Sequence, residues 1–340
     1  MGIFKEEIAI DLGTANTLII HRDQIVVDSP SVVAINSKTN KIVAIGAQAV
    51  QWEGRTHSDI KVIRPLQNGV IADFLASEHL IRNLVRQIPT LQKRIFQPSL
   101  RIVICVPSGI TPVERRAVIE SAERVNGKEV FLIDEPMAAA IGLGLDVSMP
   151  KGILIVDIGG GTSEIAVISL FGIVCGKSHK VAGNSFTNDI IHYIAEVKGT
   201  KIGDYTAEKI KINVGSVSEN LKNPPSPIHV NGKKITTGEP VQIEVSHIDV
   251  AKAINNSITS IEKSILRVLS ETPPELAGDI FENGIHLAGG GSLIRGLVER
   301  ISKITKMKVI LGDDPLGAIV KGTGIALKKF NYFKPVLENQ

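Results

Sequence analysis

The sequence predicts an α/β protein built from two related halves. Strand-like and helix-like segments alternate along its 340 residues, which is typical of sheets covered by helices. Residues 11–17 and 157–164 are similar to each other, because each segment follows an apolar run, begins with an aspartate and leads through small residues into a second apolar run. Each copy therefore predicts a strand, a tight turn and a strand. The copies begin 146 residues apart, so we expect two facing halves that each offer one carboxylate and one small-residue turn.

The composition is that of a globular protein with two ordinary domains. Apolar residues make up 43% and charged residues 21%, so each half can bury a core. The net charge of +3 predicts no strong field for nucleic acid. Cys105 and Cys175 lie in apolar runs and predict buried thiols in a reducing compartment. The chain shows no signal-peptide core and no run long enough to span a bilayer, so we expect a cytoplasmic protein.

The first half carries clear strand and helix boundaries. Residues 101–106 form an apolar run that ends at Pro107 and predicts a strand. Residues 111–114 predict a helix start, with threonine as the N-cap, proline at the first helical position and glutamate completing a capping box. Residues 129–133 predict the next strand, and residues 134–136 end it ahead of a helix.

The second half carries a glycine-rich turn and a region of different character. Residues 285–288 predict a short strand and residues 293–298 a helix, with the turn at the helix N-terminus, where free N–H groups collect around an anion or a polar ligand. Residues 182–250 predict a smaller, partly β subdomain with a hairpin turn at Asn231-Gly232. The tail, residues 331–340, shows no periodic pattern, and we expect it to be frayed.

Several motifs occur in an order that resembles one protein superfamily. The motifs are residues 11–17, 106–111, 134–142, 157–164 and 287–296, supported by 64–73, 272–277 and 313–316. In this order they resemble the actin and heat-shock-chaperone ATPase superfamily, and within it they are most similar to the MreB family of bacterial actin homologues, the rod shape-determining proteins. A single glycine-rich turn would be weak evidence, whereas five motifs in order are specific.

The resemblance implies an actin-like ATPase fold. Two duplicated domains, each with a mixed sheet flanked by helices, are expected to enclose a nucleotide cleft. Domain I is expected to span residues 1–144, with a small subdomain at about 31–68 and a C-terminal segment at about 325–340. Domain II is expected to span residues 145–324, with an inserted subdomain at about 182–250.

The two duplicated turns are the candidate site for phosphate and metal. Asp11 and Asp157 are expected to hold Mg²⁺ through its water shell, because Mg²⁺ keeps several waters and takes few direct protein ligands. A lone aspartate before glycine is usually a turn residue, but two at matched positions of duplicated turns favour a metal. Neither turn ends in Gly-Lys-Ser/Thr, which excludes the common P-loop. The residues expected to cradle the phosphates are Thr14, Ala15 and Asn16 from one side and Gly159, Gly160 and Gly161 from the other.

Glu135 is the candidate for orienting or activating the attacking water. It lies between a predicted strand and a predicted helix, which fixes its position. The resemblance implies that Thr162 assists it. The alternative for Glu135 is an acid that favours the helix dipole at the N-terminus.

The adenosine contacts rest on the resemblance. Glu208 and Lys211 lie three residues apart on a predicted helix, where alone they would be an ordinary surface pair. The resemblance implies that this segment forms one wall of the adenosine site and the glycine-rich turn the other. The residues concerned are Glu208, Lys209, Ile210 and Lys211, with Gly289, Gly290, Gly291 and Ser292.

A predicted loop combines basic and apolar residues. Residues 93–98 contain two bases followed by Ile95 and Phe96, which are expected either to insert shallowly into a membrane or to cap the core below the next strand. We leave both alternatives open here.

The function expected from the resemblance is an ATP- and Mg²⁺-dependent cytoskeletal protein. It implies weak ATPase activity, head-to-tail protofilaments at the inner face of the cell membrane, and partners among membrane morphogenesis and cell-wall synthesis proteins, with no nucleic-acid partner. The alternatives are a small-molecule kinase, which needs a further acid as base, and a chaperone-type ATPase, which normally carries a separate peptide-binding domain.

Overall fold

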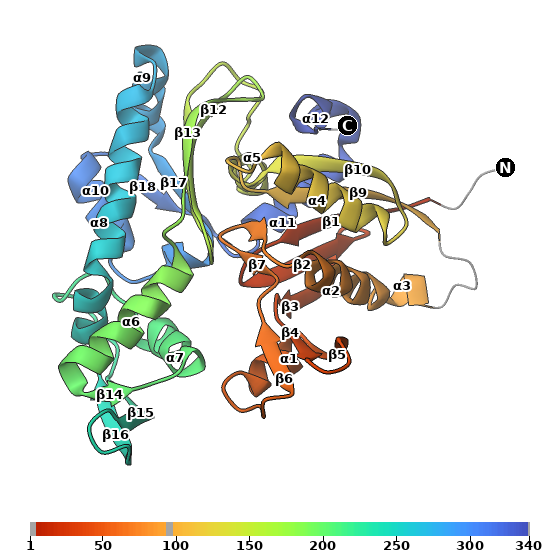
Figure 1. Ribbon diagram of the computed structural model, residues 1–340. Coiled ribbons are helices and arrows are strands. Elements are labelled where there is room, and N and C mark those ends of the chain that lie inside the picture. Colours follow the sequence, from red (N-terminus) through yellow and green to blue (C-terminus); the bar gives the residue numbers. More distant parts are fainter. Residues whose placement is uncertain (1–4, 93–97, 339–340) are drawn as a thin grey trace.

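The computed structural model describes residues 5–92 and 98–338 and contains two five-stranded sheets with the same topology (Figure 1). The first sheet has the order β10-β9-β1-β2-β3 and the second the order β18-β17-β11-β12-β13. In both, the first three strands in sequence form an antiparallel meander, and the two later strands add in parallel beside the first. The sheets are therefore mixed and duplicated, which confirms the predicted fold class.

The strands of the two large sheets have the following bounds. The first sheet consists of β1 (Lys5–Leu12), β2 (Asn16–His21), β3 (Gln24–Pro30), β9 (Ser99–Val106) and β10 (Gly127–Asp134). The second consists of β11 (Ile153–Ile158), β12 (Ser163–Ser169), β13 (Gly172–His179), β17 (Ile285–Ala288) and β18 (Val309–Leu311).

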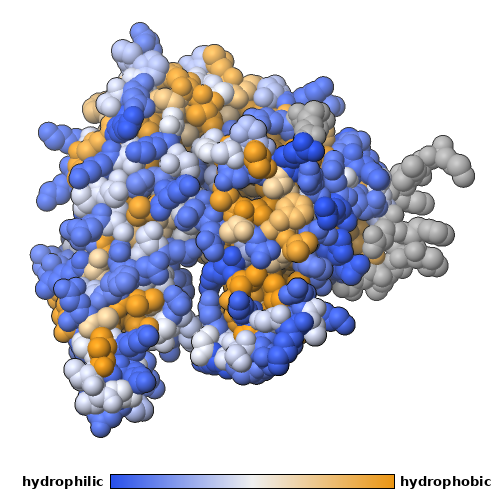
Figure 2. Space-filling view, in the orientation of Figure 1, coloured by the Kyte–Doolittle hydropathy of each residue, from blue (hydrophilic) through white to orange (hydrophobic). Residues whose placement is uncertain are grey.

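Each half also carries a lobe with a small sheet. The first lobe holds β4 (Val33–Asn36), β5 (Lys41–Ile45), β6 (Ile60–Ile63) and α1 (Ala47–Trp52), followed by the hairpin of β7 (Leu66–Gln67) and β8 (Val70–Ile71). The second lobe holds β14 (Thr200–Lys201), β15 (Ile228–Lys234) and β16 (Pro240–Val245) beside α6 (Gly183–Lys198) and α7 (Asp204–Val214). The space-filling view shows a groove between these lobes (Figure 2). At one point the Arg55 guanidinium lies 5.9 Å from the centre of the Tyr205 ring.

The remaining helices cover the sheets. The first half has α2 (Phe74–Arg86), α3 (Pro89–Gln92) and α4 (Pro112–Glu123), and the second has α8 (His247–Glu271), α9 (Pro274–Asn283) and α10 (Leu297–Thr305). Helix α4 begins with the predicted capping box, because Thr111 Oγ1 accepts from the Glu114 N–H and the Glu114 carboxylate accepts from the Thr111 N–H. Among the described residues, no helix is long and apolar enough to cross a membrane.

Two helices pack between the sheets at an unusually close distance. These are α5 (Glu135–Gly142) and α11 (Ala318–Lys328), which share a buried cluster with residues of both sheets. A methyl group on Gly142 would lie 1.8 Å from the Ala318 carbonyl oxygen, and one on Gly322 would lie 1.8 Å from that of Ala138. The contact is reciprocal, and only glycine permits it. It joins the two halves directly behind the turns.

Four local predictions need correction. Asn231-Gly232 lies inside β15, and the connection to β16 falls at residues 235–239. The turn after β17 opens the 3₁₀ turn η1 (Gly290–Leu293), and α10 begins only at Leu297. The described part of the tail is ordered as α12 (Phe330–Phe333) and η2 (Lys334–Val336), and Glu338 pairs with Leu132 of β10. Cys105 is buried as predicted, whereas Cys175 is only half-buried; both are free thiols.

Candidate functional site

The two predicted turns meet between the halves. Each connects two antiparallel strands, β1 to β2 and β11 to β12. A methyl group on Gly160 would lie 2.8 Å from the Ala15 Cβ, and one on Gly161 would lie 2.6 Å from Thr14 Oγ1. The glycines are therefore required for the close approach of the two backbones. Gly159, the third glycine, donates its N–H to the Thr162 carbonyl and closes the second turn.

The first turn is tied to the neighbouring β7–β8 hairpin. Thr14 is buried, and its hydroxyl accepts a hydrogen bond from the Gly69 N–H at 2.8 Å. Ala15 is half-buried and Asn16 is exposed at the start of β2. Of the three predicted residues, Thr14 is thus engaged with the protein, while Asn16 is exposed.

Asp11 and Asp157 lie at matched places near the ends of β1 and β11. They are 8% and 1% exposed. Burial raises the pKa of Asp11 to about 7, and burial together with the charges of Asp11 and Glu164 raises the pKa of Asp157 well above its usual range. Both shifts therefore come mainly from burial, to which the neighbouring carboxylates add at Asp157.

The donor set fits a hydrated divalent cation. Asp157 Oδ1 is buried and has no hydrogen-bond partner among the described residues, and a carboxylate oxygen in that position needs a cation or a water. Within residues 5–92 and 98–338, no group of three or more His, Cys, Asp or Glu side chains is arranged to hold a metal directly. Carboxylates that act through a water shell are the ligands that Mg²⁺ commonly takes from proteins.

Glu135 is the first residue of α5 and is 7% exposed. Burial raises its pKa well above the usual range, and the charges of Glu164, Asp157 and Asp11 add to this shift. An acid kept only for the helix dipole would sit in solvent, so its burial among carboxylates favours a role in the site. Thr162 is also buried and lies beside Gly69, but no hydrogen bond in the described chain joins it to Glu135.

The predicted adenosine segment is tied to the start of α6. Lys211 donates to the Gly183 carbonyl at 2.8 Å and to Thr187 Oγ1 at 3.0 Å, and it pairs with Glu208 at 2.7 Å. The N–H groups of residues 183 and 184 in turn donate to the carbonyls of Gly159 and Gly160. Glu208 and Lys211 are therefore connected to the second turn rather than being a simple surface pair. By contrast, Ile210 is fully buried in the core and Lys209 is exposed.

The glycine-rich turn after β17 lies directly against the second hairpin. Gly289 has φ of +79°, and a methyl group there would lie 2.6 Å from Asp157 Oδ1. A methyl group on Gly291 would overlap Ile158, and one on Gly290 would crowd Leu316. Ser292 is buried and donates to the Gly289 carbonyl at 2.6 Å. The structure thus brings this turn together with Asp157.

Sequence reasoning missed two polar residues of the site, Glu164 and Ser108. Glu164 is fully buried beside the predicted carboxylates and accepts a hydrogen bond from Ser108 at 2.6 Å. An acid inside the apolar run of the second copy was the available signal, because the first copy has Leu18 at the matching place.

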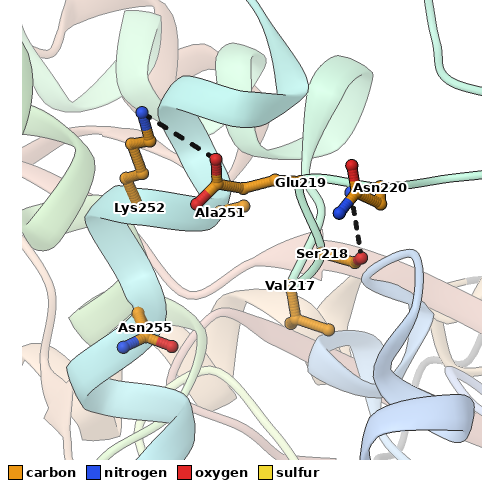
Figure 3. A pocket seen from close by; sticks show the side chains of 7 residues that line it. All are labelled: Val217, Ser218, Glu219, Asn220, Ala251, Lys252 and Asn255. Carbon is orange, nitrogen blue, oxygen red and sulfur yellow. Dashed lines mark hydrogen bonds and ion pairs between the residues drawn. The ribbon is translucent and has the colours of Figure 1, made fainter.

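A predicted membrane contact lies outside the described residues, and one cavity lies apart from the site. Ile95 and Phe96 fall outside the described residues. A cavity of about 650 Å³ lies between the segment after α7 and helix α8 (Figure 3). The cavity is lined by Val217, Ser218, Glu219, Asn220, Ala251, Lys252 and Asn255, and Glu219 and Lys252 form an ion pair at 3.8 Å. None of the predicted site residues that the structure describes lines this cavity.

Comparisons with known proteins agree with this geometry. The family model described as MreB/Mbl protein matches residues 5–335. The chain belongs to the MreB/Mbl family. The cell shape-determining protein MreB of Pasteurella multocida is 43% identical over 332 residues, which cover 96% of this chain and 94% of the relative. The cell shape-determining protein Mbl of Bacillus subtilis is 40% identical over 326 residues, covering 96% of each.

Solved structures give the same result. MreB5 of Spiroplasma citri bound to ADP superposes with a TM-score of 0.90 at 35% identity, covering 97% of this chain and 98% of that one. The same protein bound to AMPPNP gives the same score. The MamK double helical filament, at 22% identity and a TM-score of 0.79, shares the fold. This member of the MreB/Mbl family is therefore an actin-like cytoskeletal protein.

Proposed function

We propose that this chain binds ATP with Mg²⁺ between its two hairpins, hydrolyses it slowly and polymerises into filaments that direct cell-wall synthesis and maintain rod shape. The observation that carries the proposal is the meeting of two glycine-dependent turns beside two buried aspartates. Nucleotide-bound structures of the Spiroplasma citri relative and the cell shape-determining names of the curated relatives support it. The kinase and chaperone alternatives have no comparable support.

Each part of the site has a task in this proposal. When bound, Mg²⁺ would supply positive charge to the phosphate oxygens, held through water by Asp11 and Asp157. The turn backbones would surround the phosphates, and Lys211 with Glu208 would fix the turn-to-helix connection under the adenosine. The Glu135 carboxylate would orient the attacking water and accept its proton, which its raised pKa favours.

Hydrolysis would act as a timer for the filament. The nucleotide contacts turns from both halves, so loss of the terminal phosphate shifts the balance between domain arrangements. A head-to-tail contact that does not close into a ring produces an open polymer. We propose that this polymer lies at the inner face of the cell membrane, where it meets membrane morphogenesis and cell-wall synthesis proteins.

The membrane contact is proposed from the sequence alone. Two bases beside Ile95 and Phe96 suit an anionic lipid surface. The double variant Ile95→Asp with Phe96→Asp should weaken co-sedimentation with liposomes containing anionic lipid while preserving the fold. Equal lipid binding by this variant would favour the alternative, in which both residues cap the core.

The hydrolytic role is tested by phosphate release. Glu135→Ala should bind Mg·ATP with little change in affinity but release phosphate about 10²-fold more slowly or worse, because the residue that accepts the water proton is lost. Glu120→Gln, which removes an exposed acid on α4, is the matched control and should leave turnover unchanged. Unchanged turnover in Glu135→Ala would remove Glu135 from the mechanism.

A further inference from the structure

Three polar side chains form a row across the second sheet. Glu164 on β12 pairs directly with Asp157 on β11 and with Ser178 on β13. Directly paired residues of antiparallel strands point to the same face, so the three side chains line up. This face packs toward α5, because Ile155, two residues before Asp157, belongs to the cluster between the sheets. Glu164 thus lies next to the metal-binding aspartate and faces the other half.

Glu164 holds a loop that belongs to the first half. Its Oε2 accepts from Ser108 Oγ at 2.6 Å, and its Oε1 accepts from Ser178 Oγ at 2.5 Å. Ser108 lies in the loop of residues 107–110, which connects β9 to α4 and which we term the connecting loop. A methyl group on Gly109 would lie 3.0 Å from the Ser178 Cβ, so the connecting loop also packs on β13. One buried carboxylate therefore joins the two halves.

The connecting loop is linked through its neighbours to two parts of the proposed site in the first half. It follows Val106, which pairs with Asp134 at the end of β10, immediately before Glu135. Pro107 lies against Gly69, whose N–H binds Thr14 of the first turn. A displacement of the connecting loop would therefore reach Glu135 through β10 and the first turn through Gly69.

The duplicated fold does not itself require an acid at this place. In the first hairpin, Asp11 pairs with Leu18 just as Asp157 pairs with Glu164 in the second. Burying a carboxylate is unfavourable unless its hydrogen bonds are satisfied, so an apolar side chain would stabilise the sheet better. The acid, Glu164, occurs in the hairpin where it can accept a hydrogen bond from Ser108 of the other half.

We propose that Glu164 is a positioning residue that holds the connecting loop against the second hairpin through Ser108 and so keeps Glu135 in place for hydrolysis. The proposal rests on the proposed ATPase function. It makes the contact between the halves, and not only the bound nucleotide, a condition for turnover.

The test compares substitutions that remove or keep the bond between the halves. Ser108→Ala and Glu164→Gln should lower kcat roughly 10-fold or more, since small displacements of catalytic groups have large effects on rate. The Kd for Mg·AMPPNP should change less than about 3-fold, because neither residue is assigned to the phosphates or the base. Ser108→Thr keeps the hydroxyl and should regain most of the rate. Ser178→Ala keeps the hydrogen bond between the halves, so its kcat should fall less than that of Ser108→Ala.

Two controls separate this proposal from general damage and from failure of the ATPase function. Ser121→Ala removes a buried hydroxyl that donates to the Ala117 carbonyl within α4, and it should leave kcat unchanged. Hydrogen exchange with Mg·AMPPNP bound should rise at the amides of residues 108–110 in Ser108→Ala, whatever the hydrolysis rate. A kcat within 2-fold of the native value in Ser108→Ala, or unchanged exchange of the connecting loop, would overturn the proposal. If Glu135→Ala loses turnover while Ser108→Ala keeps it, the positioning role of Glu164 fails but the proposed ATPase function is still supported.

Discussion

The close crossing of α5 and α11 gives the most quantitative stability prediction. Replacing Gly322 with alanine places a methyl carbon 1.8 Å from the Ala138 carbonyl oxygen, where ordinary contacts are about 3.5 Å. The obstacle is backbone, which cannot rotate away as a side chain could. The two helices must therefore separate by about 1.5 Å, which forfeits a large part of the dispersion energy along their contact. We expect a loss of at least about 3 kcal/mol in the free energy of unfolding, at the upper end of overpacking effects.

The reciprocal geometry allows a sharper test with a double variant. Gly142→Ala meets the Ala318 carbonyl oxygen at the same 1.8 Å. One separation of the helices relieves both clashes, so the double variant should cost little more than either single variant. Gly278→Ala is the control, because a methyl group there meets nothing within 4 Å inside α9, and it should stabilise by about 0.5–1 kcal/mol.

Urea unfolding followed by circular dichroism measures the stability of the native chain and of all four variants. If Gly322→Ala unfolds at the urea concentration of the native chain, the helices do not cross as described. If the losses of the two single variants simply add, the clashes are not relieved by a shared displacement.

Three further predictions concern titration, binding and capping. The pKa of Asp11 is raised from 3.8 to about 7, so between these pH values the folded, nucleotide-free protein binds one proton more than the unfolded chain. The melting temperature should therefore fall as the pH rises from about 4 to 7. Asp11→Asn should flatten this dependence in differential scanning calorimetry. Lys211→Ala should raise the Kd for Mg·AMPPNP about 10-fold in titration calorimetry, because two charge-assisted hydrogen bonds that hold the start of α6 are lost. Lys201→Ala, at an exposed position of β14, should leave the Kd unchanged. Equal affinities of the two variants would contradict this prediction. Thr111→Ala removes the N-cap of α4 and should cost about 1 kcal/mol in urea unfolding; a change below about 0.3 kcal/mol would contradict it.

Local chemistry made several elements predictable. The duplicated turns, the capping box at Thr111 and the short strand before Gly289 depend on neighbouring residues, and all of them form as expected. Asp11 and Asp157 can be identified as candidate site residues because the duplication repeats an acid at the same place. Such signals need no knowledge of distant contacts.

Features fixed by distant contacts could not be predicted in the same way. Asn231-Gly232 has the composition of a hairpin turn, but pairing with β14 and β16 holds it in a strand. The tail lacks periodicity, yet Phe330 packs on Phe131 at 4.7 Å between ring centres, and Leu337 is buried. The role of Glu164 depends on Ser108, 56 residues earlier, which only the folded chain brings near.

Sedimentation with ATP and Mg²⁺ measures whether nucleotide binding between the two hairpins drives polymerisation. The native chain should pellet above a critical concentration when Mg·ATP is present, and Asp157→Ala should need a much higher concentration. A native chain that stays monomeric over a wide concentration range, with and without lipid, would contradict nucleotide-dependent polymerisation.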